Sequence, residues 1–231
     1  MIKILRLNKK INSFNQEINA PGDKSISIRW VLLASQAKGR SKAYNLLMSE
    51  DVLAAIDSIK KLGIKVRIQK NYCEIFGNGI NGFKYKKNLT IDAKNSGTLG
   101  RLILGLLIKS PNIIKIIGDK SLSKRDFSRV TIPLGKFGVK FSYKIKNKLP
   151  LTILGTQSAE GIKYLENKGS AQCKSSIMLA ALNASGTTSI KAKKSRNHSE
   201  LLFKYLKIPI KVKKTKKFDF IDIKKPKKIN A

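Results

Sequence analysis

Three strongly apolar segments recur along the chain, and each follows a short polar loop that is rich in small residues. The apolar segments are 30–34, 102–108 and 177–182, and their loops are 24–25, 95–98 and 170–172. An apolar segment after a capping residue predicts a buried helix that begins in the loop. Ser25, Ser96 and Ala171 mark corresponding loop positions and lie 71 and 75 residues apart. The pattern therefore predicts a structural repeat of about 70–75 residues.

A second, more polar helix follows each apolar one and leads into a short strand. These segments run from Glu50 to Val66, from Lys124 to Phe141 and from Ser199 to Val212. Gly63, Gly138 and Pro209 precede the three strands and are 75 and 71 residues apart, which gives the same period. Further runs of β-forming residues occupy 72–76, 89–92, 113–117, 151–154 and 188–191.

Each copy then has the order β-α-β-α-β-β, so we expect an α/β fold with three repeats around a pseudo-threefold axis. The first helix of each copy would be buried in a central bundle, with the three N-termini on one surface. Helix N-termini carry free N–H groups and a partial positive charge, so this surface would favour anions. The three-repeat domain is expected to span 21–222.

Both ends of the chain are expected to lie outside that domain. Residues 1–20 contain a predicted strand at Ile2–Leu7. The lysine-rich sequence that begins at Lys213 predicts a solvated tail or the start of a linker, with the tail itself at 223–231.

The charge of the chain is extreme, because 48 lysines and arginines face 14 aspartates and glutamates, a net charge of +34. Such a balance favours acidic partners: nucleic acid, anionic membrane or phosphorylated metabolites. Only eight of the 48 are arginines, and the lysines are spread along the whole chain. Nucleic-acid-binding proteins more often cluster their cations and read bases with arginine. The spread therefore favours a general enrichment in lysine, and we expect no specific nucleic-acid partner.

The remaining composition narrows the class of protein further. Cys73 and Cys173 stand alone, and His198 is the only histidine, so the sequence gives no zinc or disulfide framework. We expect no metal or cofactor, and a reducing, cytoplasmic location. The first residues do not resemble a signal peptide, and no apolar run approaches the ~18 residues of a membrane span.

The loop from Pro21 to Arg29 carries the chemistry best suited to an anion. Asp23 or Ser25 can cap the following helix, and Lys24, Ser25 and Arg29 would then meet at its N-terminus. Free N–H groups, the helix dipole and two cations together favour a phosphate or a carboxylate. The same residues also fit an ordinary capped helix with two solvated cations. If Arg29 instead binds an anion, its loss is expected to leave the fold intact.

Five short motifs follow one another between residue 21 and about residue 206. They are Pro21-Gly22-Asp23-Lys24-Ser25-Ile26-Ser27-Ile28-Arg29, Asn95-Ser96-Gly97-Thr98-x-x-Arg101, Gly118-Asp119-x-Ser121-Leu122-x-x-Arg125, Ser170-Ala171-Gln172-x-Lys174-Ser175 and Ser195-Arg196-Asn197-His198. In this order and spacing they resemble the N-terminal half of the 5-enolpyruvylshikimate-3-phosphate synthase family. The resemblance implies transfer of the enolpyruvyl group from phosphoenolpyruvate to shikimate 3-phosphate with release of phosphate, in the shikimate pathway to aromatic amino acids.

The resemblance also implies a role for each matching residue. Those that would bind shikimate 3-phosphate are Lys24, Ser25, Arg29, Ser170, Ala171, Gln172 and Ser195, with Arg29 at the carboxylate. Those that would line the phosphoenolpyruvate pocket are Lys24, Gly97, Arg125 and Gln172. Both substrates carry a phosphate and a carboxylate, so a site for them needs cations and N–H groups at several points. No residue of this half is expected to be catalytic.

The chain departs from the family pattern at three points. Ile28 stands where the family usually has His or Asn, and Asp126 replaces a proline next to Arg125, with which it is placed to pair. The third departure is length, because the family has two such domains around a cleft and this chain matches one.

We therefore expect a truncated product, a fragment or one half of a split enzyme, inactive without a complementary second-domain chain. The strand in 1–20 would pack on that missing domain. Two other hypotheses remain open at this point: a non-catalytic module that binds phosphorylated metabolites, and a basic nucleic-acid-binding protein.

Overall fold

The computed structural model describes residues 6, 8, 13, 15, 17, 18 and 20–231. The strand predicted at Ile2–Leu7 falls, apart from Arg6, outside the described residues. The helices are α1 (Lys24–Gln36), α2 (Glu50–Lys61), α3 (Gly97–Leu106), α4 (Lys120–Lys124), α5 (Ser128–Gly135), α6 (Ala171–Ala181) and α7 (His198–Tyr205). The strands are β1 (Lys38–Tyr44), β2 (Lys65–Ile68), β3 (Tyr72–Asn78), β4 (Leu89–Asp92), β5 (Ile114–Ile117), β6 (Lys140–Tyr143), β7 (Leu151–Leu154), β8 (Lys163–Glu166), β9 (Thr187–Lys193), β10 (Ile210–Lys214) and β11 (Phe218–Lys224).

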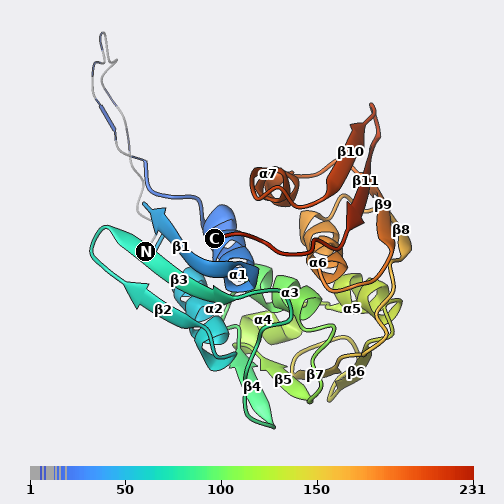
Figure 1. The fold of residues 1–231 in the computed structure, drawn as a ribbon. Coiled ribbons are helices and arrows are strands. Elements are labelled where there is room, and N and C mark those ends of the chain that lie inside the picture. The colour runs from blue at the N-terminus through green and yellow to red at the C-terminus, as the bar shows by residue number, and fades with distance from the viewer. Residues whose placement is uncertain (1–5, 7, 9–12, 14, 16, 19) are drawn as a thin grey trace.

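The strands form three sheets, one for each predicted repeat (Figure 1). Their strand orders are β1-β3-β2, β4-β5-β7-β6 and β8-β9-β11-β10. In the second and third sheets the first two strands are parallel and the other neighbours are antiparallel. The second and third repeats follow the predicted order β-α-β-α-β-β, with the short helix α4 added in the second.

The last residues of the chain complete the first sheet. Asn230 forms a parallel bridge with Lys38 of β1. The last residues thus occupy the position in the first sheet that β4 and β8 occupy in the second and third sheets. The Lys38 N–H donates to the Ile229 carbonyl at 2.8 Å, and Ile229 is buried. The chain thus returns from the third repeat to the first, as the red segment in Figure 1 shows.

The structure differs from the solvated tail expected from Lys213 onward. Residues 218–224 form β11, an inner strand of the third sheet. Asp219, Ile221 and Ile223 of this strand are buried, and the residues between them face outward. The period-2 alternation of a half-buried strand is present, but the neighbouring lysines make the segment look solvated in sequence.

The three helices predicted from the apolar segments, α1, α3 and α6, lie at the centre with the sheets outside them (Figure 1). The helices α3 and α6 approach closely at Gly105, where an added Cβ would lie 2.2 Å from the Ser176 carbonyl oxygen. Ser176 Oγ also donates to the Arg101 carbonyl at 3.0 Å. Only a residue without a side chain fits at Gly105, so this glycine sets the distance between the two helices.

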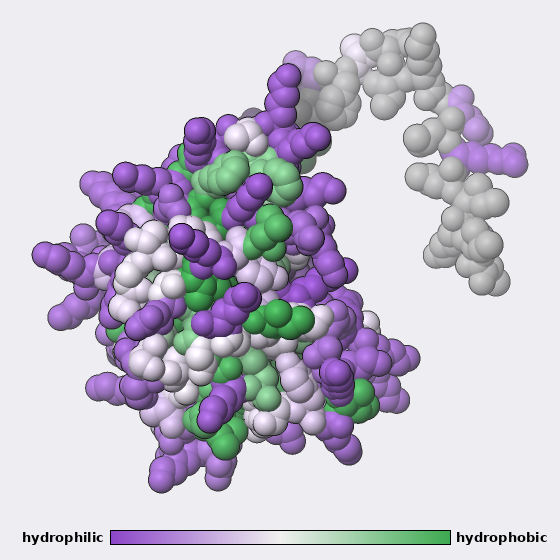
Figure 2. Space-filling model, turned by 90° about the vertical axis from the view of Figure 1, so that its right-hand side faces the viewer, coloured by the Kyte–Doolittle hydropathy of each residue, from purple (hydrophilic) through white to green (hydrophobic). Residues whose placement is uncertain are grey.

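The surface matches the composition of the chain. Figure 2 shows the side formed by the third sheet, where hydrophilic side chains project over most of the face and apolar patches lie between them. Cys73 and Cys173 are free and buried, and burial raises the pKa of these thiols to about 11 and about 12. No helix in the described part of the chain is long and apolar enough to cross a membrane.

Candidate functional site

The N-terminal turns of the three central helices are capped by side chains. Asp23 Oδ1 accepts from Ile26 N at 2.7 Å on α1, and Ser96 Oγ accepts from Leu99 N at 3.3 Å on α3. Ser170 Oγ accepts from Cys173 N at 3.2 Å on α6. Each cap satisfies one N–H group of the first turn and leaves the others free for a ligand.

Arg29 lies at the meeting point of α1, α6 and α7. Its Nε donates to Ser199 Oγ at 2.9 Å and its Nη2 donates to Ser175 Oγ at 3.1 Å. Its Nη1 donates to the Ser25 carbonyl at 3.0 Å and to Ser25 Oγ at 3.3 Å. The side chain is buried, so the expectation of a solvated cation at the helix start is wrong for Arg29. Arg29 therefore joins three helices through hydrogen bonds and also holds a positive charge in a fixed position.

The positive charge around Arg29 is concentrated. Burial first, and then the positive charge of Arg196, lower the pKa of Arg29 to about 10. Burial also lowers the pKa of His198, with the charge of Arg29 as the next cause. Like charges held together in a partly dry site are stabilised when an anion binds between them.

A second cluster of guanidinium groups lies at the N-terminus of α3. Arg101 Nη1 donates to Gln172 Oε1 at 2.8 Å, and Gln172 Nε2 donates to Thr98 Oγ1 at 3.2 Å. A Cβ added at Gly97 would lie 2.9 Å from Arg101 Nη1 and 3.2 Å from Arg125 Nη1. Both guanidinium groups therefore lie directly beside the bare backbone of Gly97.

The charges of this cluster also repel one another. Burial lowers the pKa of Arg101, and the positive charges of Arg125 and Arg129 lower it further. Gln172 and Ser175 stand three residues apart on α6, and they contact Arg101 and Arg29 respectively. The helix α6 thus joins the two cationic clusters into one site.

Asp126 does not pair with Arg125. Its carboxylate accepts from Ser128 N at 2.8 Å and from Ser128 Oγ at 2.5 Å, and so caps the start of α5. Arg125 Nη2 instead donates to Asn95 Oδ1 at 3.3 Å. The second helix of this repeat begins at Ser128, four residues later than the sequence pattern predicts, and Arg125 forms no ion pair with Asp126.

The other residues implied by the resemblance lie around these two clusters. Lys24 is exposed and forms an ion pair with Asp51 of α2 at 2.9 Å. Ala171 is buried beside the cap residue Ser170 in the first turn of α6. Ser195 is half-buried, and within the described part of the chain its Oγ has no hydrogen-bond partner. Ile28 is fully buried in the core, so the apolar side chain at this position does not remove a polar group from the site.

Sequence reasoning missed three residues that shape the site. Arg101 was part of a motif but had no role assigned, although it lies four residues after Gly97 and hence on the same helix face. Ser175 and Ser199 hold the Arg29 guanidinium and hydrogen-bond to each other at 2.7 Å. Ser175 ends one of the motifs but had no role assigned. No local pattern distinguishes Ser199, because the helices that carry the two serines meet only in the folded protein.

A buried ion pair joins the same two helices beside Ser175 and Ser199. Lys174 and Glu200 are the neighbours of Ser175 and Ser199 in sequence, and Lys174 Nζ lies 2.6 Å from Glu200 Oε1. Both side chains are buried, at 0% and 5% exposure. Two adjacent residues of α6 are thus bound to two adjacent residues of α7, which fixes the position of α7 relative to Arg29.

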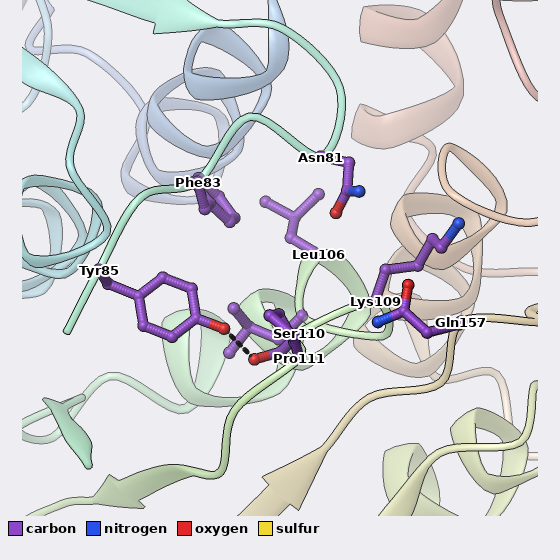
Figure 3. Close-up of a pocket in the computed structure, with 9 residues that line it drawn as sticks. Asn81, Phe83, Tyr85, Leu106, Lys109, Ser110, Pro111 and Gln157 are labelled. Atoms are coloured by element: carbon purple, nitrogen blue, oxygen red, sulfur yellow. Dashed lines mark hydrogen bonds between the residues drawn. The ribbon is translucent and has the colours of Figure 1, made fainter. Parts of the chain in front are cut away.

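A separate cavity of about 240 Å³ lies at the opposite end of α3 from Gly97. Figure 3 shows that the β3–β4 connection supplies Phe83 and Tyr85 to its wall, and that the Tyr85 hydroxyl is hydrogen-bonded to Ser110 Oγ. None of the residues implied by the resemblance lines this cavity. In the described part of the chain, no group of three or more His, Cys, Asp or Glu side chains is placed to hold a metal ion.

The fold and the site together define a class of protein: an α/β domain of three repeats that brings capped helix N-termini and guanidinium groups together. The chain belongs to the EPSP synthase family, whose family model, "EPSP synthase (3-phosphoshikimate 1-carboxyvinyltransferase)", matches residues 8–228.

Individual relatives agree with this assignment. A 3-phosphoshikimate 1-carboxyvinyltransferase of Streptococcus mutans is 39% identical over 202 residues, which are 87% of this chain and 47% of the relative. The enzyme of the same name from Streptococcus pyogenes is 40% identical over 201 residues, 86% of this chain and 46% of the relative. The structure of EPSP synthase from Acinetobacter baumannii superposes with a TM-score of 0.86 at 30% identity, over 93% of this chain and 48% of that one. The chain spans about half the length of the curated relatives it matches.

Proposed function

We propose that this domain binds shikimate 3-phosphate and forms one wall of an enolpyruvyl transferase site. In the reaction, a hydroxyl oxygen of shikimate 3-phosphate adds to the central carbon of phosphoenolpyruvate while the methylene carbon gains a proton. Loss of that proton and of inorganic phosphate then gives the enolpyruvyl ether. We place shikimate 3-phosphate at the cluster around Arg29 and phosphoenolpyruvate at the cluster around Gly97.

The observation that carries the proposal is the packing of mutually repelling guanidinium groups beside capped helix N-termini. Burial and neighbouring positive charge lower the pKa of both Arg29 and Arg101. A phosphate or carboxylate between such groups makes charge-assisted hydrogen bonds and removes the repulsion. Two anionic substrates would meet on the two sides of Gln172, which contacts Arg101 directly and lies one turn before the Arg29 partner Ser175.

The proton transfers require groups that we place on a complementary second domain. We assign none of the described side chains a proton-transfer role, and we place the second domain over this site. Closure would exclude water and strengthen each electrostatic contact. We therefore propose that the chain acts in the cytoplasm together with a second-domain partner, and that it is inactive by itself.

Release of inorganic phosphate from the two substrates tests this proposal. The chain alone should release none, and a mixture with the C-terminal half of the Streptococcus mutans relative should restore turnover. The Arg125→Gln variant in the same mixture serves as a control for the site, and it should lower turnover at subsaturating phosphoenolpyruvate. Turnover by the chain alone would mean that it contains its own proton-transfer groups, and the division of labour proposed here would be wrong.

A further inference from the structure

The outer face of the first sheet carries aromatic and cationic side chains that enolpyruvyl transfer does not use. Cys73, Ile75 and Gly77 of β3 face the core, so the alternate residues of this strand point outward. The strand register then places the following residues on one face: Lys38, Arg40, Lys42 and Tyr44 from β1; Tyr72, Glu74, Phe76 and Asn78 from β3; Lys65 and Arg67 from β2. The helices α1 and α2 lie on the opposite face (Figure 1).

Cations from both flanking strands lie over the aromatic rings. The pairs, with the distance from the cationic group to the ring centroid, are Lys42–Tyr72 (3.7 Å), Lys42–Tyr44 (4.9 Å), Arg67–Phe76 (5.3 Å) and Lys65–Phe76 (5.5 Å). Among these outward residues the one acid is Glu74, whose side chain is 8% exposed and lies 3.5 Å from Arg40. The face thus presents rings along its middle strand and positive charge on both sides.

A general enrichment in lysine does not explain this arrangement, because the three sheets differ. The outward residues of the second sheet are Thr90, Asp92, Lys115, Ile117, Lys140, Ser142, Thr152 and Leu154, without an aromatic ring or an arginine. In the third sheet Lys191 lies over Phe218 and Phe220, but the outward positions hold no arginine. Arginine on a sheet face is confined to the first sheet of the described strands, at Arg40 and Arg67.

We propose that the outer face of the first sheet binds single-stranded nucleic acid without sequence selectivity. Bases stack on exposed aromatic rings, and lysines and arginines beside the rings bind the phosphates between the bases. Arginine serves both purposes, since its planar guanidinium group also stacks on bases. A binding mode of this kind reads no base edges, so it agrees with the expectation of no specific nucleic-acid partner.

Two further features favour this ligand over other polyanions. The outward residues of the sheet include no aliphatic side chain that could insert into a lipid surface. Tyr44 is 67% exposed and is open to stacking.

Fluorescence anisotropy with the full chain tests the proposal. The probes are a labelled oligouridine of about 12 nucleotides, a duplex with the same number of phosphates, heparin as competitor and phosphatidylserine vesicles. The single strand should bind at least about tenfold more tightly than the duplex, because only unpaired bases offer their faces for stacking. Equal affinity for strand and duplex, or preferential binding to the vesicles, would overturn the proposal.

Matched variants separate the contribution of base stacking from the contributions of charge on this face and of charge on the rest of the chain. The Tyr72→Leu and Phe76→Leu variants keep apolar bulk and should each weaken single-strand binding about tenfold, with little effect on the duplex. The Lys42→Gln/Arg67→Gln variant should lower the slope of log affinity against log salt by about 1.4, since each phosphate contact contributes about 0.7.

The Lys115→Gln/Lys140→Gln variant on the second sheet removes the same charge, and it should change neither the affinity for the single strand nor the salt dependence. Equal weakening by this control variant would show that the charge acts diffusely. Circular dichroism and melting curves of all variants show whether the sheet is intact. Unchanged binding with lower stability would mean that the cation–π pairs only stabilise the sheet, which also contradicts the proposal.

Discussion

The buried ion pair between α6 and α7 gives the sharpest prediction about stability. The Glu200→Gln change keeps the shape of the side chain but removes the charge that lies 2.6 Å from Lys174 Nζ. Lys174 has no exposed surface, so its ammonium group would remain buried without an opposite charge. Loss of one partner of a buried pair costs about 3–5 kcal/mol, a large part of a total stability of about 5–15 kcal/mol.

Urea unfolding followed by circular dichroism measures this cost. The midpoint should fall strongly while the slope of the transition stays unchanged. The Lys174→Met/Glu200→Leu double variant should recover most of the loss, because apolar replacement of a whole buried pair is often neutral or stabilising. The Asp51→Asn variant, which breaks the exposed pair with Lys24, is the control and should cost less than about 1 kcal/mol. A cost of the same small size for Glu200→Gln would refute the tight α6–α7 contact.

Three more predictions concern the candidate site. The Arg29→Ala variant should lower stability by about 1.5–3 kcal/mol in urea unfolding, because it removes charge-assisted hydrogen bonds that join three helices. The Gly97→Ala variant should stay folded, since its Cβ meets only the flexible ends of two arginines, but in the reconstituted enzyme its KM for phosphoenolpyruvate should rise about tenfold. Folding lowers the pKa of His198, so the neutral imidazole contributes its full stabilisation above about pH 6.5, and this stabilisation is lost as the pH falls toward the folded pKa. Melting curves of the His198→Gln variant should lose this pH dependence.

The repeat and its helices were predictable because they depend on local signals. A capping residue before an apolar segment fixes the start of a helix, and α1, α3 and α6 begin where the loops predict. The strand β1 was not predicted, since the sequence Lys38–Tyr44 is polar and contains Gly39, and its inward side chains at Ser41 and Ala43 are small. Strand formation there depends on pairing with β3 rather than on propensity.

The chemistry of the site was predictable only where one motif holds all the partners. Lys24, Ser25, Gly97 and Arg125 belong to recognisable loops, whereas the burial of Arg29 depends on serines that are 146 and 170 residues away in sequence. The pairing expected for Asp126 was wrong for a similar reason. A short-range contact with Ser128 competes for the same carboxylate, and in the fold it is the one that forms.

The central claim is that the cationic cluster around Arg29 is a site for shikimate 3-phosphate, and His198 offers a direct test. It is the only histidine of the chain, so its imidazole protons give a single assignable signal in proton NMR. Burial and, next, the charge of Arg29 lower the pKa of His198, and the anionic groups of a bound ligand would offset that charge. Saturation with shikimate 3-phosphate should therefore raise the pKa of His198, and shikimate, which keeps the carboxylate but lacks the phosphate, should raise it clearly less. An unaltered pKa in the presence of shikimate 3-phosphate, or an equal rise with shikimate, would contradict the account.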